Sequence, residues 1–531
     1  MSDKPIILSE DAQRYLGRDA QRNNILAARI LAETIKTTLG PKGMDKMLVD
    51  AAGNIIVTND GVTILEEMEI EHPAAKMIVE IAKTQEKEVG DGTTTAVMLA
   101  GRLLENAEKL LDRKIHPTII TKGYRMAAEK SQEILKLLAV EINKEEDLLK
   151  VAQTAMTGKG AEYSKDLFDD IIVRAIKLIS ENGKVDLENI KIEKVKGESM
   201  EKTELIEGLV LDKERLSKEM PQKITGARIA LLDTPLEIKT LGNETRISIT
   251  SPEQLQTFIN REEQEIKAMI EKIKTAGANV IVCQKGIDDI AQFYLAKSGI
   301  YALRRVERSD LQKLAKATSG KIITNVKDIT SHDLGFAAVV EEVKEGDDYF
   351  TFIRGCKNPK AITIMIRGGT EHVIDEIERA IKDALGDVAS VVKNPLIVAG
   401  GGAVEIELAK KIREFSQTLK GREQLAVEEF AAALEYIPAT LAENAGLDSL
   451  DILTELKASH DAGNRFDGLN VFTGKIENTL ELGIIEPLKV KTQAISSASE
   501  VASMILRVDD VIASNKGKNR NINPSMMQGY D

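Results

Sequence analysis

The chain has 531 residues, of which 43% are hydrophobic and 30% are charged, a composition typical of folded globular proteins. This length is too great for one hydrophobic core and predicts about three domains. A formal net charge of −13, only 3% aromatic residues and no basic run argue against a nucleic-acid-binding protein. No apolar run could span a bilayer and residues 1–10 lack a signal-peptide pattern, so we expect a cytoplasmic protein without a membrane partner.

The first predicted elements are a helix and a hairpin. Apolar residues recur at helical spacing over residues 18–38, and the run LGPKG at residues 39–43 ends that helix. Two short apolar runs at residues 46–50 and 55–58 flank a Gly-Asn turn, which predicts a β-hairpin. The residues that follow, including Asp60, end the second strand and precede another helix.

The most informative run is GDGTTT at residues 90–95, which interrupts a long helical region and leads into an apolar helix. Glycines allow close backbone approach, and the hydroxyls and free N–H groups of a helix's first turn donate to phosphate oxygens. Asp91 would repel phosphate unless a cation lay between them, and Mg²⁺ prefers one or two carboxylates plus phosphate oxygens. The run therefore predicts a phosphate cradle. The alternative is an ordinary helix start with capping threonines.

The middle of the chain has a different texture. Short apolar strands at residues 227–232, 280–283, 300–303 and 322–323 are separated by helical stretches, which predicts an α/β domain. The chain's two cysteines, Cys283 and Cys356, are too few for a disulfide framework and have no neighbouring His for a zinc site. We expect both to be small core residues.

A long helix is predicted to begin at residues 251–254, where SPEQ supplies a cap, a proline in the first turn and a glutamine three residues after the cap. An apolar stripe continues as far as residue 273. Such a helix could simply cover the sheet. It could also project as an arm, because residues 261–265 make one central turn polar all round.

Glycine-rich turns that could face a nucleotide lie near residues 40–43, 90–92, 158–160 and 400–402, whereas residues 215–365 have no comparable cluster. This distribution predicts a nucleotide domain assembled from both ends of the chain, with the middle inserted into it. The glycines at 400–402 precede a helix and offer a second backbone surface to a nucleotide. A tight strand-to-helix turn is the alternative.

Several separate runs together resemble group II chaperonins, the thermosome family. The matching segments, in the order and spacing of that family, are residues 38–46, 58–65, 90–95, 157–161 and 400–403. The resemblance covers essentially the whole chain and is nearer to the archaeal type than to the subunits of the eukaryotic hetero-oligomeric relative. It implies a multidomain protein that combines α and α/β domains.

The resemblance implies three domains, each with its own range. They are a mainly helical equatorial ATP-binding domain (1–143 and 402–531), a small intermediate domain (144–214 and 366–401) and an α/β apical substrate-binding domain (215–365) with a helical protrusion at about 240–275. In this family the protrusion forms a built-in lid, so no separate lid protein is expected. Ile247, Ile249 and Phe258 are candidates for exposed apolar contacts at its tip, with core packing as the alternative.

The resemblance also implies an ATP-dependent molecular chaperone. Two stacked rings of identical or paralogous subunits would capture non-native proteins in a chamber, close, and promote folding as ATP is bound and hydrolysed to ADP and phosphate. Non-native proteins are the expected clients, and ATP and Mg²⁺ the expected cofactors. Residues 523–531 depart from the Gly- and Met-rich tail of many relatives, which puts any function of that tail in doubt.

The resemblance assigns two catalytic carboxylates, Asp60 and Asp383. Asp383 would orient or activate the attacking water, and Asp60 would assist near an Mg²⁺ ion bound by Asp91. Because Asp383 would lie in the intermediate domain, hydrolysis would wait for closure. Lys159 could reach the γ-phosphate. Taken alone, Asp60 is an ordinary turn residue, Asp383 a helix-surface acid and Lys159 a solvated base.

The expected nucleotide contacts come from several loops. Glu486 would accept hydrogen bonds from ribose hydroxyls, and Asn470 would lie on the adenine and ribose side or simply serve a turn. The full set is Leu39, Gly40, Pro41, Asp91, Gly92, Thr93, Thr94, Thr95, Thr157, Gly158, Lys159, Gly402, Asn470 and Glu486.

Two other classes of function remain. A small-molecule kinase would also bind Mg-ATP, but the chain shows no signature of an acceptor pocket. A ring that held proteins without hydrolysing ATP could dispense with Asp383. Particle size separates the chaperonin, a very large assembly, from a kinase of this chain length.

Overall fold

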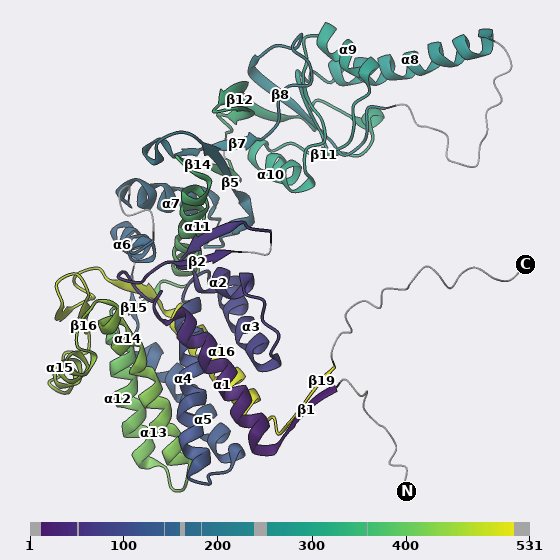
Figure 1. The fold of residues 1–531 in the computed structure, drawn as a ribbon. Helices are drawn as coiled ribbons and strands as arrows, with labels where there is room; N and C mark the ends of the chain where they lie inside the picture. The colour runs from purple at the N-terminus through teal and green to yellow at the C-terminus, as the bar shows by residue number, and fades with distance from the viewer. Residues whose placement is uncertain are drawn as a thin grey trace, which may run out of the picture. The chain divides into compact units, whose positions relative to one another are not determined.

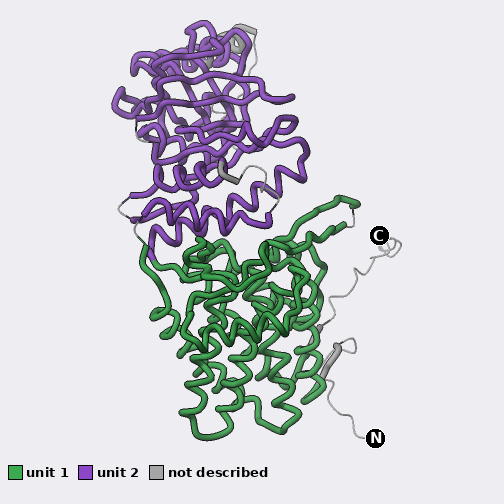
Figure 2. Tube along the Cα trace, turned by 90° about the vertical axis from the view of Figure 1, so that its left-hand side faces the viewer, with its two compact units in different colours: residues 1–142, 396–531 green, residues 143–395 purple. Residues whose placement is uncertain are grey.

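The computed structural model describes residues 12–49, 52–142, 144–159, 165–181, 183–237, 252–357 and 359–514. The chain forms two compact units, shown in different colours in Figure 2: unit 1 comprises Met1–Ile142 and Leu396–Asp531, and unit 2 comprises Asn143–Pro395. Unit 1 therefore draws on both ends of the chain. The candidate tip residues Ile247 and Ile249, the side chain of Phe258 and the tail at residues 523–531 lie outside the described residues.

Unit 1 consists mainly of helices (Figure 1). The predicted helix at residues 18–38 is confirmed, and the long helical region that residues 90–95 interrupt is confirmed as three helices. The helices of unit 1 are α1 (Gly17–Lys36), α2 (Gly61–Glu67), α3 (Pro73–Glu88), α4 (Thr93–Asp112), α5 (Pro117–Leu138), α12 (Ala403–Thr418), α13 (Glu423–Leu434), α14 (Tyr436–Asn444), α15 (Ser449–Asp461) and α16 (Leu488–Leu506).

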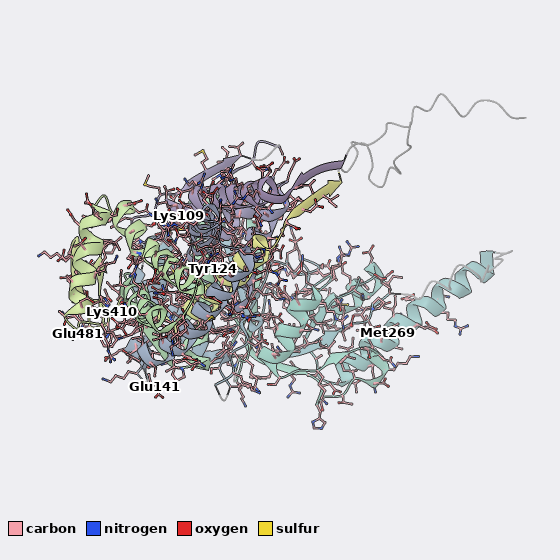
Figure 3. All side chains as sticks on the ribbon, turned by 90° about the horizontal axis from the view of Figure 1, so that it is seen from below. Lys109, Tyr124, Glu141, Met269, Lys410 and Glu481 are labelled. Carbon is pink, nitrogen blue, oxygen red and sulfur yellow. The ribbon has the colours of Figure 1, made fainter. Side chains whose placement is uncertain are left out.

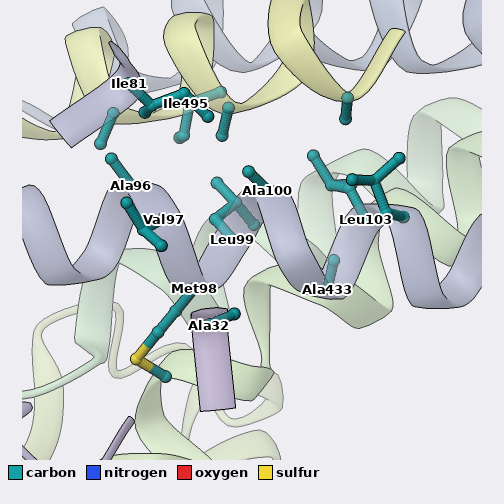
Figure 4. Packing of buried hydrophobic residues seen from close by; sticks show 14 of the residues in the cluster. Ala32, Ile81, Ala96, Val97, Met98, Leu99, Ala100, Leu103, Ala433 and Ile495 are labelled. Carbon is teal, nitrogen blue, oxygen red and sulfur yellow. The ribbon is translucent and has the colours of Figure 1, made fainter. Parts of the chain in front are cut away.

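Helix α4 is the central element of this unit, because it packs against α1, α3, α13 and α16. Its apolar residues are buried on several sides, and Figure 4 shows Val97, Leu99 and Leu103 among side chains of neighbouring helices. Gly101 allows the closest approach, since a Cβ there would lie 2.4 Å from Cβ of Ala32 on α1. A helix buried on several sides has apolar or small residues nearly all round, as α4 does over residues 96–101.

Tyr124 on α5 adds a polar contact to the same core. It lies among the helices of unit 1 (Figure 3). Its ring meets that of Phe430 edge-on, with the ring centroids 5.9 Å apart, and its hydroxyl donates to the carbonyl of Leu103 at 2.7 Å. Burial raises the pKa of this phenol, so the hydroxyl stays a donor. The hydrogen bond offsets the cost of burying the hydroxyl.

The strands of unit 1 form small antiparallel pairings. The predicted hairpin is confirmed, with β2 paired to β3. Because β15 pairs with both β4 and β18, unit 1 resumes at Leu396, before residue 402. The strands are β1 (Ala12–Leu16) paired with β19 (Asp510–Ser514), β2 (Lys46–Val49) with β3 (Ile55–Thr58), β16 (Asp467–Asn470) with β17 (Lys475–Asn478), and the sheet of β18 (Ile485–Pro487), β15 (Leu396–Ala399) and β4 (Val140–Glu141).

Unit 2 combines helices with two sheets. The four predicted strands of the middle region are confirmed as β8, β9, β10 and β11, which pair with one another in parallel, whereas β8 is antiparallel to β12. The larger sheet has the order β10 (Tyr301–Leu303), β9 (Val280–Cys283), β8 (Lys223–Leu232), β12 (Gly335–Glu345), β13 (Asp348–Arg354), β7 (Gly208–Leu211), with β11 (Ile322–Ile323) on β8; the smaller sheet is β5 (Ile190–Lys196), β14 (Ile362–Gly368), β6 (Glu204–Ile206). The helices are α6 (Glu145–Met156), α7 (Lys165–Ile179), α8 (Pro252–Thr275), α9 (Asp289–Lys297), α10 (Arg308–Thr318) and α11 (Glu371–Lys393).

Helix α8 confirms the predicted long helix and satisfies both interpretations in part. Ile266, Ile270 and Ile273 are buried against the larger sheet's core. Arg261, by contrast, has 80% of its side chain exposed, and Figure 1 shows the first turns of α8 extending beyond the sheet. Met269, labelled in Figure 3, is partly buried and packs against the same core cluster as these isoleucines.

One buried arginine links the smaller sheet to its surroundings. Arg367 on β14 has only 6% of its side chain exposed and pairs with Glu204 at 3.0 Å, Glu198 at 3.3 Å and Glu345 at 3.5 Å. Glu345 ends β12 of the larger sheet, whereas Glu204 belongs to β6 of the smaller one. This guanidinium therefore joins the two sheets of unit 2, as do the pair of Arg354 with Glu204 and the hydrogen bond from Val210 N–H to the Thr363 hydroxyl.

Both cysteines are buried, which confirms them as core residues. Burial raises the pKa of the Cys283 thiol and of the Cys356 thiol to about 11. At about pH 8 only roughly one thiol in a thousand is then a thiolate. We expect the folded protein to resist alkylation by iodoacetamide at that pH and to react at both sites after unfolding, as mass spectrometry would show. Reaction at the same rate before and after unfolding would contradict the burial.

Candidate functional site

Asp60 is placed by the turn between β3 and α2. Its carboxylate caps α2: Oδ2 accepts from the Thr63 backbone N–H at 2.9 Å and from its hydroxyl at 2.6 Å, and Oδ1 accepts from Val62 N–H at 3.3 Å. Asp60 therefore does serve the turn. A carboxylate has about four acceptor positions, so capping leaves room for a further donor or a metal-bound water.

The run at residues 90–95 forms a loop that opens α4, as predicted. Gly92 stands just before the helix with φ of +78°, a left-handed conformation that favours glycine. Oδ1 of Asp91 accepts from the Gly92 N–H at 2.7 Å. A lone carboxylate in a loop rich in hydroxyls and N–H groups suits Mg²⁺ held partly by phosphate oxygens. Among the described residues no three His, Cys, Asp or Glu side chains gather to hold a metal.

The Asp60 turn lies directly against this loop. A Cβ added to Gly61 would lie 2.6 Å from the hydroxyl oxygen of Thr94 and 3.3 Å from that of Thr93. The starts of α2 and α4 therefore meet, and the structure brings Asp60 and the threonine hydroxyls into one neighbourhood within unit 1.

Gln85 supports this loop through hydrogen bonds to backbone carbonyls, a role that the sequence analysis did not predict. This side chain on α3 is fully buried, and its Nε2 donates to the carbonyls of Asp91 at 2.8 Å and Val490 at 3.2 Å. A Cβ on Gly92 would lie 2.6 Å from Cγ1 of Val490 and 3.1 Å from Nε2 of Gln85. The available signal was a single amide on the apolar face of a helix that also carries Ile78 and Ile81.

Helix α14 supports two glycine loops at once, and it too was missed. A Cβ on Gly40 would lie 2.4 Å from Cδ2 of Leu441, and a Cβ on Gly402 would lie 2.5 Å from Cβ of Pro438. Both glycines have φ near +80°, at +79° and +81° respectively. Gly402 precedes α12, so the predicted glycine turn before a helix is confirmed. Helix α14 therefore lies against two loops, that of Leu39, Gly40 and Pro41 and that of Gly402.

Asn444 at the end of α14 fixes the Gly40 loop through the backbone. Its Nδ2 donates to the carbonyl of Lys36, the last residue of α1, at 3.0 Å and to the carbonyl of Leu39, beside Gly40, at 2.9 Å. Such an amide satisfies carbonyls that a helix end leaves without partners.

We expect Asn444→Ala to loosen this loop and raise the Kd for the expected nucleotide, ATP, by roughly tenfold, equivalent to about 1.4 kcal/mol. The carbonyl of Leu39 loses its side-chain donor, and that of Lys36 keeps only the Leu39 N–H at 3.3 Å. Calorimetric titration with ATP measures this. Asn464→Ala is the matched control, since Asn464 is exposed and its Nδ2 donates only to the Ser459 hydroxyl, at 3.2 Å, among the bonds of its side chain. Equal ATP affinity in the two variants would contradict a role for Asn444 in placing the loop.

Glu486 lies on β18 beside the turn of Gly400, whose Cβ would stand 3.1 Å from its Oε1. Its Oε2 pairs with Nζ of Lys491 at 2.7 Å, and the same ammonium pairs with Glu405 at 2.8 Å. Burial, Glu405 and Asp91 raise the pKa of Glu486, and Lys491 opposes them. Burial lowers the pKa of Lys491, but the two carboxylates outweigh burial and hold it well above its usual range.

Asn470 serves a turn, which was one of its two interpretations. Its Oδ1 accepts from Phe472 N–H at 3.1 Å, and its Nδ2 donates to Glu477 at 2.8 Å within the β16–β17 hairpin. The preceding Leu469 donates its N–H to the carbonyl of Gly401 at 2.8 Å. The hairpin therefore lies against the glycine turn before α12.

The remaining candidates belong to unit 2. Thr157, Gly158 and Lys159 follow α6, and Gly158 has φ of +83°. Nζ of Lys159 lies 2.5 Å from Oδ2 of Asp383 on α11, and their side chains are only 19% and 9% exposed. Asp383 is therefore buried rather than a helix-surface acid, and Lys159 is paired rather than freely solvated.

Comparison with known proteins defines the class of this protein. The chain belongs to the TCP-1/cpn60 chaperonin family, whose family model matches residues 31–516. The resemblance to group II chaperonins, the thermosome family, is likewise confirmed: the chain is 58% identical over 514 residues to a thermosome subunit of Methanopyrus kandleri, covering 96% of this chain and 94% of the relative.

Further relatives agree with this assignment. Thermosome subunit beta of Archaeoglobus fulgidus is 59% identical over 514 residues (96% of this chain and 94% of the relative). Thermosome subunit alpha of the same organism is 56% identical over 530 residues (99% and 97%). Family membership confirms the expected function class, an ATP-dependent chaperone for protein folding, and the mixture of helices and sheets fits the family. Among the described residues, none of the helices has the length and apolar character needed to cross a membrane.

Proposed function

We propose that this chain binds Mg-ATP in unit 1 and hydrolyses it to ADP and phosphate to drive protein folding. The observation that carries this proposal is the convergence of glycine loops in unit 1. The turn at Gly61 touches the threonines that open α4, and α14 supports both Gly40 and Gly402. Such loops present backbone N–H groups and left-handed glycines where a phosphate chain can approach closely.

In this proposal the phosphate chain lies on the loop at residues 90–95, with donors from the hydroxyls and N–H groups of Thr93, Thr94 and Thr95. Asp91 would bind Mg²⁺, which neutralises charge on the phosphate oxygens when it is bound. Asp60 stands beside the same threonines through Gly61 and would hold a metal-bound water. Leu39, Gly40, Pro41 and Gly402 would line the backbone side of the nucleotide, and Asn470 and Glu486 its sugar side.

Asp383 would orient and deprotonate the attacking water. Phosphoryl transfer depends chiefly on positioning and charge neutralisation, so one well-placed carboxylate has a large effect. Lys159 pairs with Asp383, and this ion pair holds the carboxylate in one orientation. In the proposal, the ammonium of Lys159 would also recognise the γ-phosphate. Thr157 and Gly158 would shape this loop.

We further propose the division into three domains, with unit 1 close to the equatorial domain. Unit 2 would contain the apical domain (215–365) and the intermediate domain (144–214 and 366–401) except for its last residues, 396–401, which belong to unit 1. Subunits would assemble into two stacked rings around a chamber for non-native proteins in the cytoplasm. The alpha and beta subunits named in Archaeoglobus fulgidus support rings of paralogous subunits as well as identical ones. The segment at about 240–275 would form a built-in lid, so a separate lid protein would not be needed.

The test is refolding by the purified particle. We expect the protein to elute as a very large assembly and to restore the activity of a chemically denatured enzyme with Mg-ATP, but not with ADP or with ATP after Mg²⁺ is chelated. A small oligomer that turns over ATP onto an added metabolite would favour a kinase instead. Refolding at the same yield without nucleotide would contradict an ATP-driven chamber.

A further inference from the structure

Unit 1 contains a buried cation that the proposed chemistry leaves without a role. Lys491 on α16 has only 8% of its side chain exposed, and its ammonium lies 2.7 Å from Glu486 and 2.8 Å from Glu405. Lysine is rarely buried unless it is paired, and here one cation serves two carboxylates. Such an arrangement is costly to build, so it needs an explanation beyond packing.

The two carboxylates differ in what they can reach. Glu405 on α12 has 6% of its side chain exposed, so its part is to hold Lys491 from the protein side. Glu486 has 25% of its side chain exposed. Its Oε2 is taken by Lys491, whereas its Oε1 faces the backbone of Gly400, where a Cβ would lie only 3.1 Å away. One oxygen of Glu486 is therefore anchored, and the other faces the glycine turn of the candidate nucleotide site.

We propose that Lys491 is a positioning residue that makes the site selective for nucleotides with ribose hydroxyls, by holding Glu486 ionised and in one orientation. This inference rests on the proposed function, in which Glu486 accepts from the ribose. A sugar hydroxyl donates best to a charged acceptor. An anchored carboxylate also loses little rotational freedom when the sugar binds.

Removal of Lys491 would change both the charge of Glu486 and its orientation. Glu405 and Glu486 would then face each other without a cation, with Asp91 adding further negative charge nearby. One of the carboxyl groups would take up a proton, as happens when like charges share a buried site. Glu486 would also lose the contact that fixes its Oε2. The sugar would then meet a weaker and less ordered acceptor, while the phosphate loops at Gly40 and Gly92 would keep their own supports.

The experiment measures the binding of ATP, 2′-deoxy-ATP and 3′-deoxy-ATP, each with Mg²⁺, to the assembled protein by titration calorimetry. We expect the wild type to bind ATP roughly tenfold more tightly than the weaker of the two analogues, the gain from one charged hydrogen bond. Lys491→Met should remove this preference. Glu405→Gln is the matched control: it alters the same ion cluster but leaves Lys491 on Glu486, so it should keep the preference.

The double variant Glu405→Gln/Lys491→Met guards against misfolding, because it removes one buried charge of each sign; it too should bind the three nucleotides equally. A wild-type ratio of affinities in Lys491→Met or in the double variant would overturn the role of Lys491. So would a wild type that binds all three nucleotides equally, although ATP binding itself would stand. A wild type that binds none of them would instead contradict the nucleotide site in unit 1.

Discussion

Replacing Asp383 with alanine should lower kcat for ATP hydrolysis by about 10²–10⁴-fold, the usual contribution of a general base, and should leave ATP binding intact. The physical reason is that Asp383 would orient the attacking water without holding the nucleotide. Its burial and its 2.5 Å contact with Lys159 fix the carboxylate in one position. Phosphate release and ATP affinity, measured on the same assembled particle, separate the two effects.

Asp375→Asn provides the matched control for this prediction. Asp375 lies on the same helix, α11, and pairs with Lys194 at 2.9 Å, but its side chain is 34% exposed. The Asp375→Asn variant should hydrolyse ATP at the wild-type rate. Asp383→Ala should also fail to refold a denatured enzyme, although it still assembles. If it hydrolyses ATP and refolds the enzyme as well as the wild type does, Asp383 has no catalytic part.

Arg367→Met should destabilise unit 2 by about 3 kcal/mol, because it removes the buried cation that three carboxylates share, although Lys202 stays beside Glu198 and Arg354 beside Glu204. Glu198, Glu204 and Glu345 all pair with this guanidinium, which is only 6% exposed. The loss should fall on the joint between the two sheets. Hydrogen–deuterium exchange of the β5, β6 and β14 amides should speed up by roughly 10²-fold or more.

Lys202→Ala is the control for the arginine. Lys202 also pairs with Glu198, at 3.4 Å, but its side chain is 64% exposed, so its loss should cost less than about 1 kcal/mol. If Arg367→Met does not fold, Arg367→Lys keeps the charge with fewer donors and should fall between the wild type and complete loss. Equal exchange in the Arg367 and Lys202 variants would show that the buried cluster does not hold the sheets together.

Local patterns predicted the elements well because their causes are local. The helix α1, the hairpin of β2 and β3 and the start of α4 all follow from apolar spacing and from glycine or proline at their ends. The strands of the middle region follow from short apolar runs in the same way. The side chains that support the candidate site do not follow from such patterns.

Gln85, Asn444 and Lys491 illustrate the reason. Gln85 bonds to a carbonyl 405 residues away, and the partner of Asn444 at Leu39 is equally distant in the chain. In the sequence, Lys491 looks like an ordinary basic residue on an amphipathic helix. Only the folded chain shows that Glu405 lies beside it. Lys159 and Asp383 lie 224 residues apart, so their ion pair was equally hidden, although resemblance had singled out each residue. A polar side chain's role depends on partners that only the folded chain brings together.

Because unit 1 is assembled from both ends of the chain, it cannot finish folding until synthesis is nearly complete. Helix α4 is synthesised early, yet α13 and α16, which cover it, come only after the whole of unit 2. Unit 2 is continuous and can fold while synthesis goes on, whereas the sides of α4 that α13 and α16 cover must wait, although α1 and α3 are already present. A chain that stops before α16 therefore leaves exposed the part of the unit 1 core that α16 covers. A protein of the chaperone class is thus, during its own synthesis, a candidate client.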